Sequence, residues 1–129
     1  MGYLIMNGNR TGFTFVELMV VMAIVALMIT IALPRYYAGM ERAKEAILKE
    51  DLFIMRDAID DYYVDKGQYP RSLGVLVEER YLRAIPPDPI TDSNNTWILI
   101  GLPQNPSVVY DVRSGAEGEA LDGTPYYEW

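Results

Sequence analysis

An apolar stretch near the amino terminus constrains this chain more than any other feature. Residues 13–33 contain a single charged side chain, that of Glu17. At 1.5 Å rise per residue, a helix over this stretch is roughly 31 Å long, close to the hydrocarbon thickness of a bilayer. We therefore predict one membrane-spanning helix here, which leaves enough chain for one small domain.

The residues before the stretch differ from an ordinary secretory signal. Such a signal has a short apolar core followed by a small residue at which it is cleaved. Here the apolar run is longer, and the small residue, Gly12, stands before it. Cleavage after Gly12 would leave the helix on the product. Arg10 lies before the span and the chain beyond it is acidic, which predicts a cytoplasmic amino terminus and an exported remainder.

The run Gly12-Phe13-Thr14-x-x-Glu17, joined to this span, resembles the class III signal of the type IV pilin and type II secretion pseudopilin family. In that family a membrane aspartic peptidase cuts after the glycine and methylates the new amino terminus. The resemblance implies cleavage between Gly12 and Phe13 and N-methylation of Phe13. It gives a cleaved leader of residues 1–12, a transmembrane and assembly helix of residues 13–34, and a globular domain of residues 35–129 that includes the second half of the helix.

Glu17 has two interpretations. A carboxylate inside a span costs about 2.5–3.5 kcal/mol on insertion scales and is a functional candidate by default. Thr14-x-x-Glu17 is also a capping box, in which each side chain satisfies a backbone amide at a helix start. The family resemblance favours the functional interpretation, in which the carboxylate of Glu17 pairs with the Phe13 amine of a neighbouring subunit. We predict that assembly depends on Glu17 and Phe13, because the apolar surroundings disfavour leaving either charge alone.

A helical pattern continues after the span. Apolar side chains recur at intervals of four and three residues, which predicts one amphipathic helix with Leu48, Leu52, Met55, Ile59 and Tyr62 on its buried side. Pro34 should kink this helix, because its ring removes a backbone donor. Lys66 should end it, with Gly67 as a left-handed cap.

The remaining chain predicts a small α+β domain. Ser72 should cap a short helix, and residues 85–95 read as a loop by composition. Residues 96–102 and 108–112 predict two strands joined by a hairpin loop of about five residues. The fold class is therefore α+β and pilin-like: a long N-terminal helix packed on a small C-terminal antiparallel sheet.

Composition excludes several functions. The chain has 11 basic and 18 acidic side chains, which argues against nucleic-acid binding. It has no histidine and no cysteine, which excludes histidine acid-base catalysis and thiol chemistry. The sequence has neither a nucleophile-base pair nor a phosphate loop, so we predict that the protein is not an enzyme.

Within the family, the domain resembles the major, G-type pseudopilin of type II secretion. Four segments carry this resemblance in the same order along the chain: residues 41–44, 63–70, 81–89 and 114–118. Members of that subfamily hold a calcium ion in the carboxyl-terminal loop, and the resemblance implies Glu117 and Asp122 as ligands, with Glu119 as a weaker third.

The carboxyl-terminal tail departs from the subfamily pattern. The acidic run near the end is reduced, and the segment after Pro89 differs from the usual continuation. Calcium takes six to eight oxygen ligands, which a turn-rich acidic loop can supply. The alternative is an acidic turn without metal, in which the tail closes by packing Tyr126 and Trp129.

The resemblance implies a filament subunit of the type II secretion pseudopilus that drives protein export across the outer membrane. Its partners would be copies of itself, other pseudopilins, the prepilin peptidase and methyltransferase, the inner-membrane assembly platform with its ATPase, and the bilayer. The protein would cross the bacterial inner membrane once, with the domain in the periplasm. A type IV pilin, major or minor, is the alternative, and an uncleaved membrane-anchored binding module is a further one.

Overall fold

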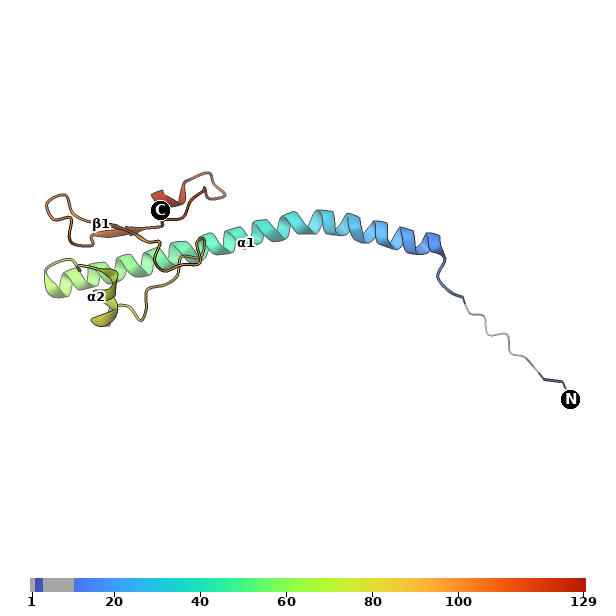
Figure 1. Ribbon diagram of the computed structural model, residues 1–129, viewed down its shortest axis with the longest axis horizontal. Coiled ribbons are helices and arrows are strands. Elements are labelled where there is room, and N and C mark those ends of the chain that lie inside the picture. Colours follow the sequence, from blue (N-terminus) through green and yellow to red (C-terminus); the bar gives the residue numbers. More distant parts are fainter. Residues whose placement is uncertain (1, 4–10) are drawn as a thin grey trace. The chain divides into compact units, whose positions relative to one another are not determined.

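The computed structural model describes residues 2–3 and 11–129 (Figure 1). Arg10, the basic residue of the predicted leader, lies outside these residues. Along the chain the elements are α1 (Phe15–Lys66), α2 (Leu73–Glu78), β1 (Ile98–Ile100), β2 (Asp111–Arg113) and the short 3-10 helix η1 (Tyr126–Glu128). The chain forms two compact units, Met1–Ala38 and Gly39–Trp129, and α1 contributes to both.

Helix α1 is 52 residues long and its helical backbone continues through Pro34. The proline lacks an amide hydrogen, so one hydrogen bond of the helix is missing there. The kink predicted at Pro34 stays a prediction. Of the helices in the described part of the chain, α1 is the one that is long and apolar enough to cross a membrane, by length and composition.

The end of α1 and the start of α2 follow the predicted local chemistry. Gly67 has φ of +71°, and its amide donates to the carbonyl of Tyr63 at 2.8 Å. Glycine adopts this left-handed conformation without the steric cost of a Cβ atom. Ser72 then caps α2, because its hydroxyl oxygen accepts from the amide of Val75 at 3.3 Å. Both predicted caps are confirmed.

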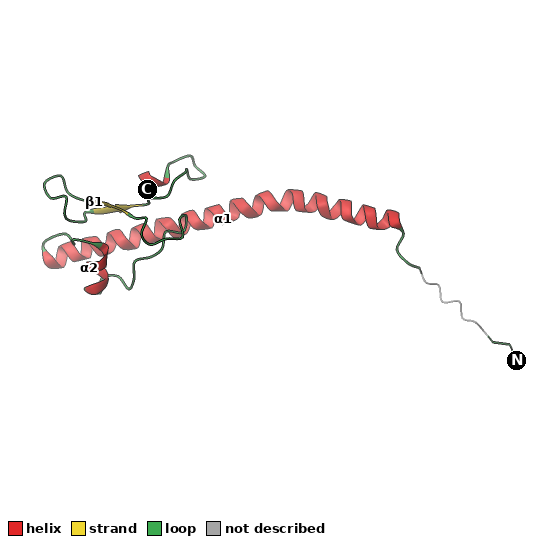
Figure 2. Ribbon diagram, in the orientation of Figure 1, coloured by secondary structure: helices red, strands yellow, loops and turns green. Residues whose placement is uncertain are grey.

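The core of the Gly39–Trp129 unit lies along one face of α1. The five predicted side chains Leu48, Leu52, Met55, Ile59 and Tyr62 are buried, and Ala58 joins them. Residues from α2, β2 and the carboxyl-terminal segment complete the same cluster, among them Leu76, Val112 and Tyr126. Figure 2 distinguishes the helices of this α+β arrangement from its small sheet. The predicted fold class is confirmed.

The sheet is smaller than predicted. Strands β1 and β2 have three residues each and pair antiparallel, with Leu99 opposite Val112. The connection covers residues 101–110, so the predicted hairpin loop of five residues is wrong. The backbone explains the difference: Val109 donates its amide to the carbonyl of Pro70 at 2.7 Å rather than to β1. Pro103 and Pro106 have no amide to donate to the ladder.

Candidate functional site

The predicted cleavage site lies in exposed, non-helical backbone. Residues 11–14 precede α1, and the side chain of Phe13 is 89% exposed. A Cβ atom added to Gly12 would meet no other atom of the described chain within 4 Å. The described fold therefore does not require glycine at this position, and such exposed terminal segments are the accessible targets of proteases. Cleavage between Gly12 and Phe13 stays a prediction.

Glu17 lies in the first turn of α1 and takes part in a capping box. Its backbone amide donates to the hydroxyl oxygen of Thr14 at 3.1 Å, and its carboxylate accepts from the amide of Thr14 at 3.4 Å. Two backbone amides that lack helical partners are satisfied in this way. The second contact is long for a hydrogen bond and leaves the carboxylate able to accept from further donors.

The span displays apolar side chains around its whole circumference. A helix that is apolar on all sides requires a membrane or other subunits as its surroundings. The hydroxyl of Thr30, in the last turn of the span, donates to the carbonyl of Ala26 at 2.8 Å and is satisfied within the helix. The exposed large side chains are Phe15, Val16, Leu18, Met19, Val20, Val21, Met22, Ile24, Val25, Leu27, Met28, Ile29, Ile31 and Leu33.

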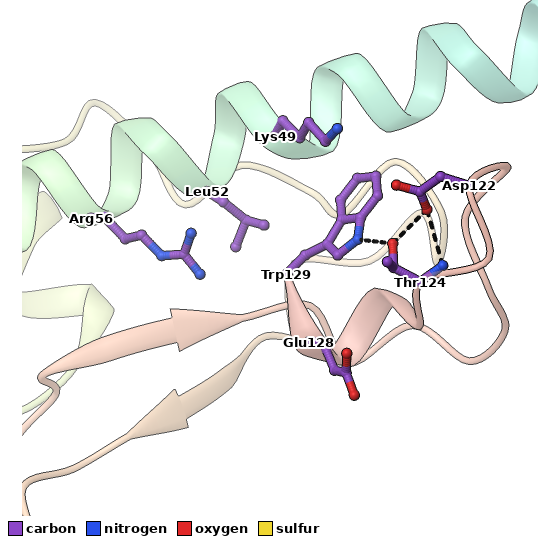
Figure 3. Close-up of a pocket in the computed structure, with 7 residues that line it drawn as sticks. All are labelled: Lys49, Leu52, Arg56, Asp122, Thr124, Glu128 and Trp129. Carbon is purple, nitrogen blue, oxygen red and sulfur yellow. Dashed lines mark hydrogen bonds between the residues drawn. The ribbon is translucent and has the colours of Figure 1, made fainter.

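The carboxyl-terminal loop is organised around Asp122. One oxygen of its carboxylate, Oδ1, accepts from the amide of Thr124 at 3.0 Å and from its hydroxyl at 2.6 Å (Figure 3). The indole Nε1 of Trp129 donates to the same hydroxyl oxygen at 2.9 Å. The hydrogen bonds from Thr124 lower the pKa of Asp122 below its ordinary value.

Glu45 on α1 ties this loop to the helix. Its Oε1 accepts from the amide of Leu121 at 2.7 Å and from the hydroxyl of Tyr126 at 3.2 Å. Burial, together with this hydrogen bond, raises the pKa of Tyr126 to about 12. One turn along α1, the ammonium of Lys49 lies 4.5 Å from the centre of the Trp129 ring, within the range of a cation-π contact. Helix and loop are thus joined by polar and aromatic contacts.

The predicted calcium ligands do not form a three-carboxylate site. In the part of the chain that the structure describes, no three acidic side chains lie close enough together to hold an ion. Glu117 and Glu119 are exposed, and Asp122 accepts the two hydrogen bonds from Thr124. Glu117, Glu119 and Asp122 therefore do not form the predicted ligand set in this structure. Calcium binding itself stays an untested prediction.

The sequence analysis missed a buried carboxylate. Asp88 is fully buried; its Oδ1 accepts from the amide of Ile90 at 2.8 Å, and its Oδ2 accepts from the hydroxyl of Ser114 at 2.5 Å. The contact to Ile90 is an Asx turn, which an aspartate between prolines predicts. The contact to Ser114 has no local signal, because 26 residues separate the two.

A second missed contact joins α1 to β2. The Nε of Arg56 lies 2.9 Å from Oδ1 of Asp111, and its Nη2 donates to the carbonyl of Val112 at 2.9 Å. The helical pattern identified the apolar side of α1 but not the partners of its flanking charges. Arg56 also lines an open groove of about 360 Å³ with Lys49, Asp122 and Trp129 (Figure 3).

Comparison with known proteins finds relatives of two kinds, type IV pilins and core proteins G of type II secretion. Residues 7–33 match the family described as prokaryotic N-terminal methylation motif. The chain is 39% identical to a fimbrial protein of Neisseria meningitidis, over 62% of this chain and 51% of that protein. It is 28% identical to the type II secretion system core protein G of Escherichia coli, over 86% of this chain and 85% of that protein.

Other relatives repeat this division. The core protein G of Dickeya chrysanthemi is 29% identical over 78% of this chain and 65% of its own length. The chain spans about half or less of the length of the Neisseria pilins that it matches. No solved structure matches the chain. In its methylation motif, its long apolar helix and its small antiparallel sheet, the chain is similar to type IV pilins and to core protein G of type II secretion.

Proposed function

We propose that this protein is a structural filament subunit, a pseudopilin of the type II secretion pseudopilus. The observation that carries the proposal is the extent of its similarity to core protein G, which covers more than four fifths of both chains. The matches to pilins are higher in identity but cover a smaller part of each protein. Similarity over most of both chains favours the pseudopilin.

The mature subunit would begin at Phe13 after the prepilin peptidase cuts and methylates it. Before processing, the amino terminus is cytoplasmic; the first half of α1 crosses the inner membrane once, and the domain lies in the periplasm. The uniformly apolar anchor supports insertion into the bilayer and packing against other anchors, and head-to-tail packing of identical subunits gives open helical filaments. The assembly platform, its ATPase and other pseudopilins are the further partners.

The protein does mechanical rather than chemical work in this proposal. The names of its relatives, a fimbrial protein and a type II secretion system core protein G, state no enzymatic activity. The polar contacts of the domain, such as those of Glu45 and Arg56, join its own elements. They support a domain built to be rigid and to pack, not one built for catalysis.

Deletion of the gene distinguishes a subunit of the type II secretion system from a subunit of a type IV pilus. Loss of a pseudopilin leaves secreted enzymes in the periplasm while surface pili are still made. The full chain supplied from a plasmid should restore secretion, and a variant blocked at the cleavage site, Gly12→Val, should not. Normal secretion with loss of surface pili would instead establish the alternative, a type IV pilin.

A further inference from the structure

We propose that the carboxyl-terminal loop is closed by an aromatic and hydrogen-bonded clamp on α1 that does not depend on calcium. We define this clamp as Glu45 and Lys49 of α1 with Asp122, Thr124, Tyr126 and Trp129 of the loop. The proposal concerns the folded domain and holds whichever filament the subunit enters.

Three backbone carbonyls of the loop already accept hydrogen bonds from the loop's own amides. The carbonyl of Gly118 accepts from the amide of Tyr126 at 3.3 Å, and that of Ala120 accepts from Gly123 at 2.9 Å. The carbonyl of Thr124 accepts from the amide of Ala120 at 2.7 Å. Calcium needs six to eight oxygens directed at one point, and a loop whose carbonyls bond to its own amides directs them elsewhere.

The carboxylate of Asp122 has its hydrogen-bond donors within the loop. Its Oδ1 faces the amide and hydroxyl of Thr124, as in an Asx turn. That hydroxyl in turn accepts from the indole of Trp129, so the carboxylate, the threonine and the tryptophan form one chain of hydrogen bonds (Figure 3). A carboxylate used in this way anchors the end of the chain without an ion.

The loop is attached to α1 through Leu121, Tyr126 and Trp129. The rings of Tyr126 and Trp129 meet edge to face with centres 5.4 Å apart, an arrangement that such rings prefer. Tyr126 donates to Glu45, and the ammonium of Lys49 lies over the Trp129 ring. Leu121 donates its backbone amide to Glu45 as well. These contacts hold the loop against α1, which is the stabilising role that a bound ion would have.

Thermal unfolding of the full chain in detergent micelles tests the proposal. Near-ultraviolet circular dichroism would follow the tertiary contacts in chelator, in calcium chloride and in magnesium chloride as the ionic control. We expect the same Tm in all three solutions, because a ligand that binds only the folded state would raise it. Thr124→Val removes the hydroxyl at the centre of the clamp and should lower Tm by about 4–8 °C in each solution.

Two further variants separate the clamp from a metal site. The double variant Glu117→Gln, Glu119→Gln removes the exposed predicted ligands and should leave Tm unchanged. Trp129→Phe keeps an aromatic ring but loses the indole donor, so it should lower Tm by less than Thr124→Val. A rise of Tm in calcium but not magnesium, lost in the double variant, would overturn the proposal. Unchanged Tm values for both Thr124→Val and Trp129→Phe would overturn it as well.

Discussion

The anchor and the globular domain differ in where their apolar side chains lie and in how far away their polar groups find hydrogen-bond partners. In the anchor, large apolar side chains are exposed, and its polar groups bond within three or four residues, as Thr14 does with Glu17 and Thr30 with Ala26. In the domain, apolar side chains are buried and polar groups pair over long separations, as Glu45 does with Leu121.

This difference shows which part of the molecule is complete by itself. A buried polar group is stable when it has partners, and the domain supplies them from its own chain. Exposure of an apolar surface to water is unfavourable, and the anchor's own chain does not cover its surface. The anchor therefore needs lipid or another subunit around it. Stability should therefore depend on the domain and assembly on the anchor.

The largest effect is expected at Glu17. Glu17→Gln keeps a side chain that can complete a capping box but loses the charge, whereas Thr14→Ala breaks the cap and keeps the charge. If Glu17 pairs with the Phe13 amine of a neighbour, Glu17→Gln should reduce filament yield by about 30-fold, since loss of a desolvated charge pair costs 2 kcal/mol or more. Thr14→Ala should assemble nearly normally.

Filaments sheared or extracted from cells expressing each variant provide the measurement, with processing and membrane insertion checked on the same samples. Both variants should be inserted and cleaved. If Thr14→Ala abolishes assembly while Glu17→Gln assembles, the capping box is the role of Glu17 and the intersubunit pair is wrong.

Removal of the buried carboxylate should have the largest effect on the domain. Asp88→Ala leaves the amide of Ile90 and the hydroxyl of Ser114 without their acceptor. We expect the free energy of unfolding to fall by about 3 kcal/mol, because buried donors left without an acceptor each cost about 1–3 kcal/mol. Denaturant titration measures it, and Asp61→Ala on the exposed face of α1 should change it little. Equal effects of the two substitutions would show that the Asp88 network is not a stabilising feature.

High pH should weaken the clamp through Tyr126. Its folded pKa of about 12 lies above the ordinary value near 10, so the folded state favours the protonated phenol. The resulting stability is fully present below about pH 10 and is lost as pH rises towards 12. Tyr126→Phe should lower stability by about 1 kcal/mol at neutral pH and reduce the alkaline loss. Tyr127→Phe, at an exposed position, should keep the wild-type profile.

The smallest effect is expected at low pH. The pKa of Asp122 is lowered in the folded state by its hydrogen bonds to Thr124. Its contribution is therefore present above the unfolded pKa near 3.9 and is lost as pH falls through the lower folded value. Unfolding titrations below about pH 4 should show a shallower acid loss in Asp122→Asn than in the wild type. Identical acid profiles would remove Asp122 from the clamp.

Local chemistry explains what the sequence predicted well. The span follows from composition, the buried side of α1 from its periodicity, and the caps at Gly67 and Ser72 from residue type. Each of these depends on neighbours within about one or two turns of helix. The motif from Gly12 to Glu17 belongs to the same class, since its residues are adjacent in the chain.

Long-range contacts explain what it did not predict. The strands are shorter than predicted because the amide of Val109 donates to the carbonyl of Pro70, which lies far earlier in the chain. Asp88 finds Ser114, and Glu45 finds Leu121, only after folding brings them together. The carboxylates of the carboxyl-terminal loop were assigned to a metal from family resemblance alone. The structure instead gives Asp122 a partner two residues away, in the kind of Asx turn that an aspartate favours.

We propose that the anchor is processed and then packs against other subunits. Mass spectrometry of the amino-terminal peptide, purified from membranes of the native host, tests the processing step. We expect a chain that begins at Phe13 and carries one added methyl group on its amine. The same peptide should remain attached to the leader in Gly12→Val. An unmodified chain that still contains residues 1–12 in wild-type membranes would show that the anchor is not processed.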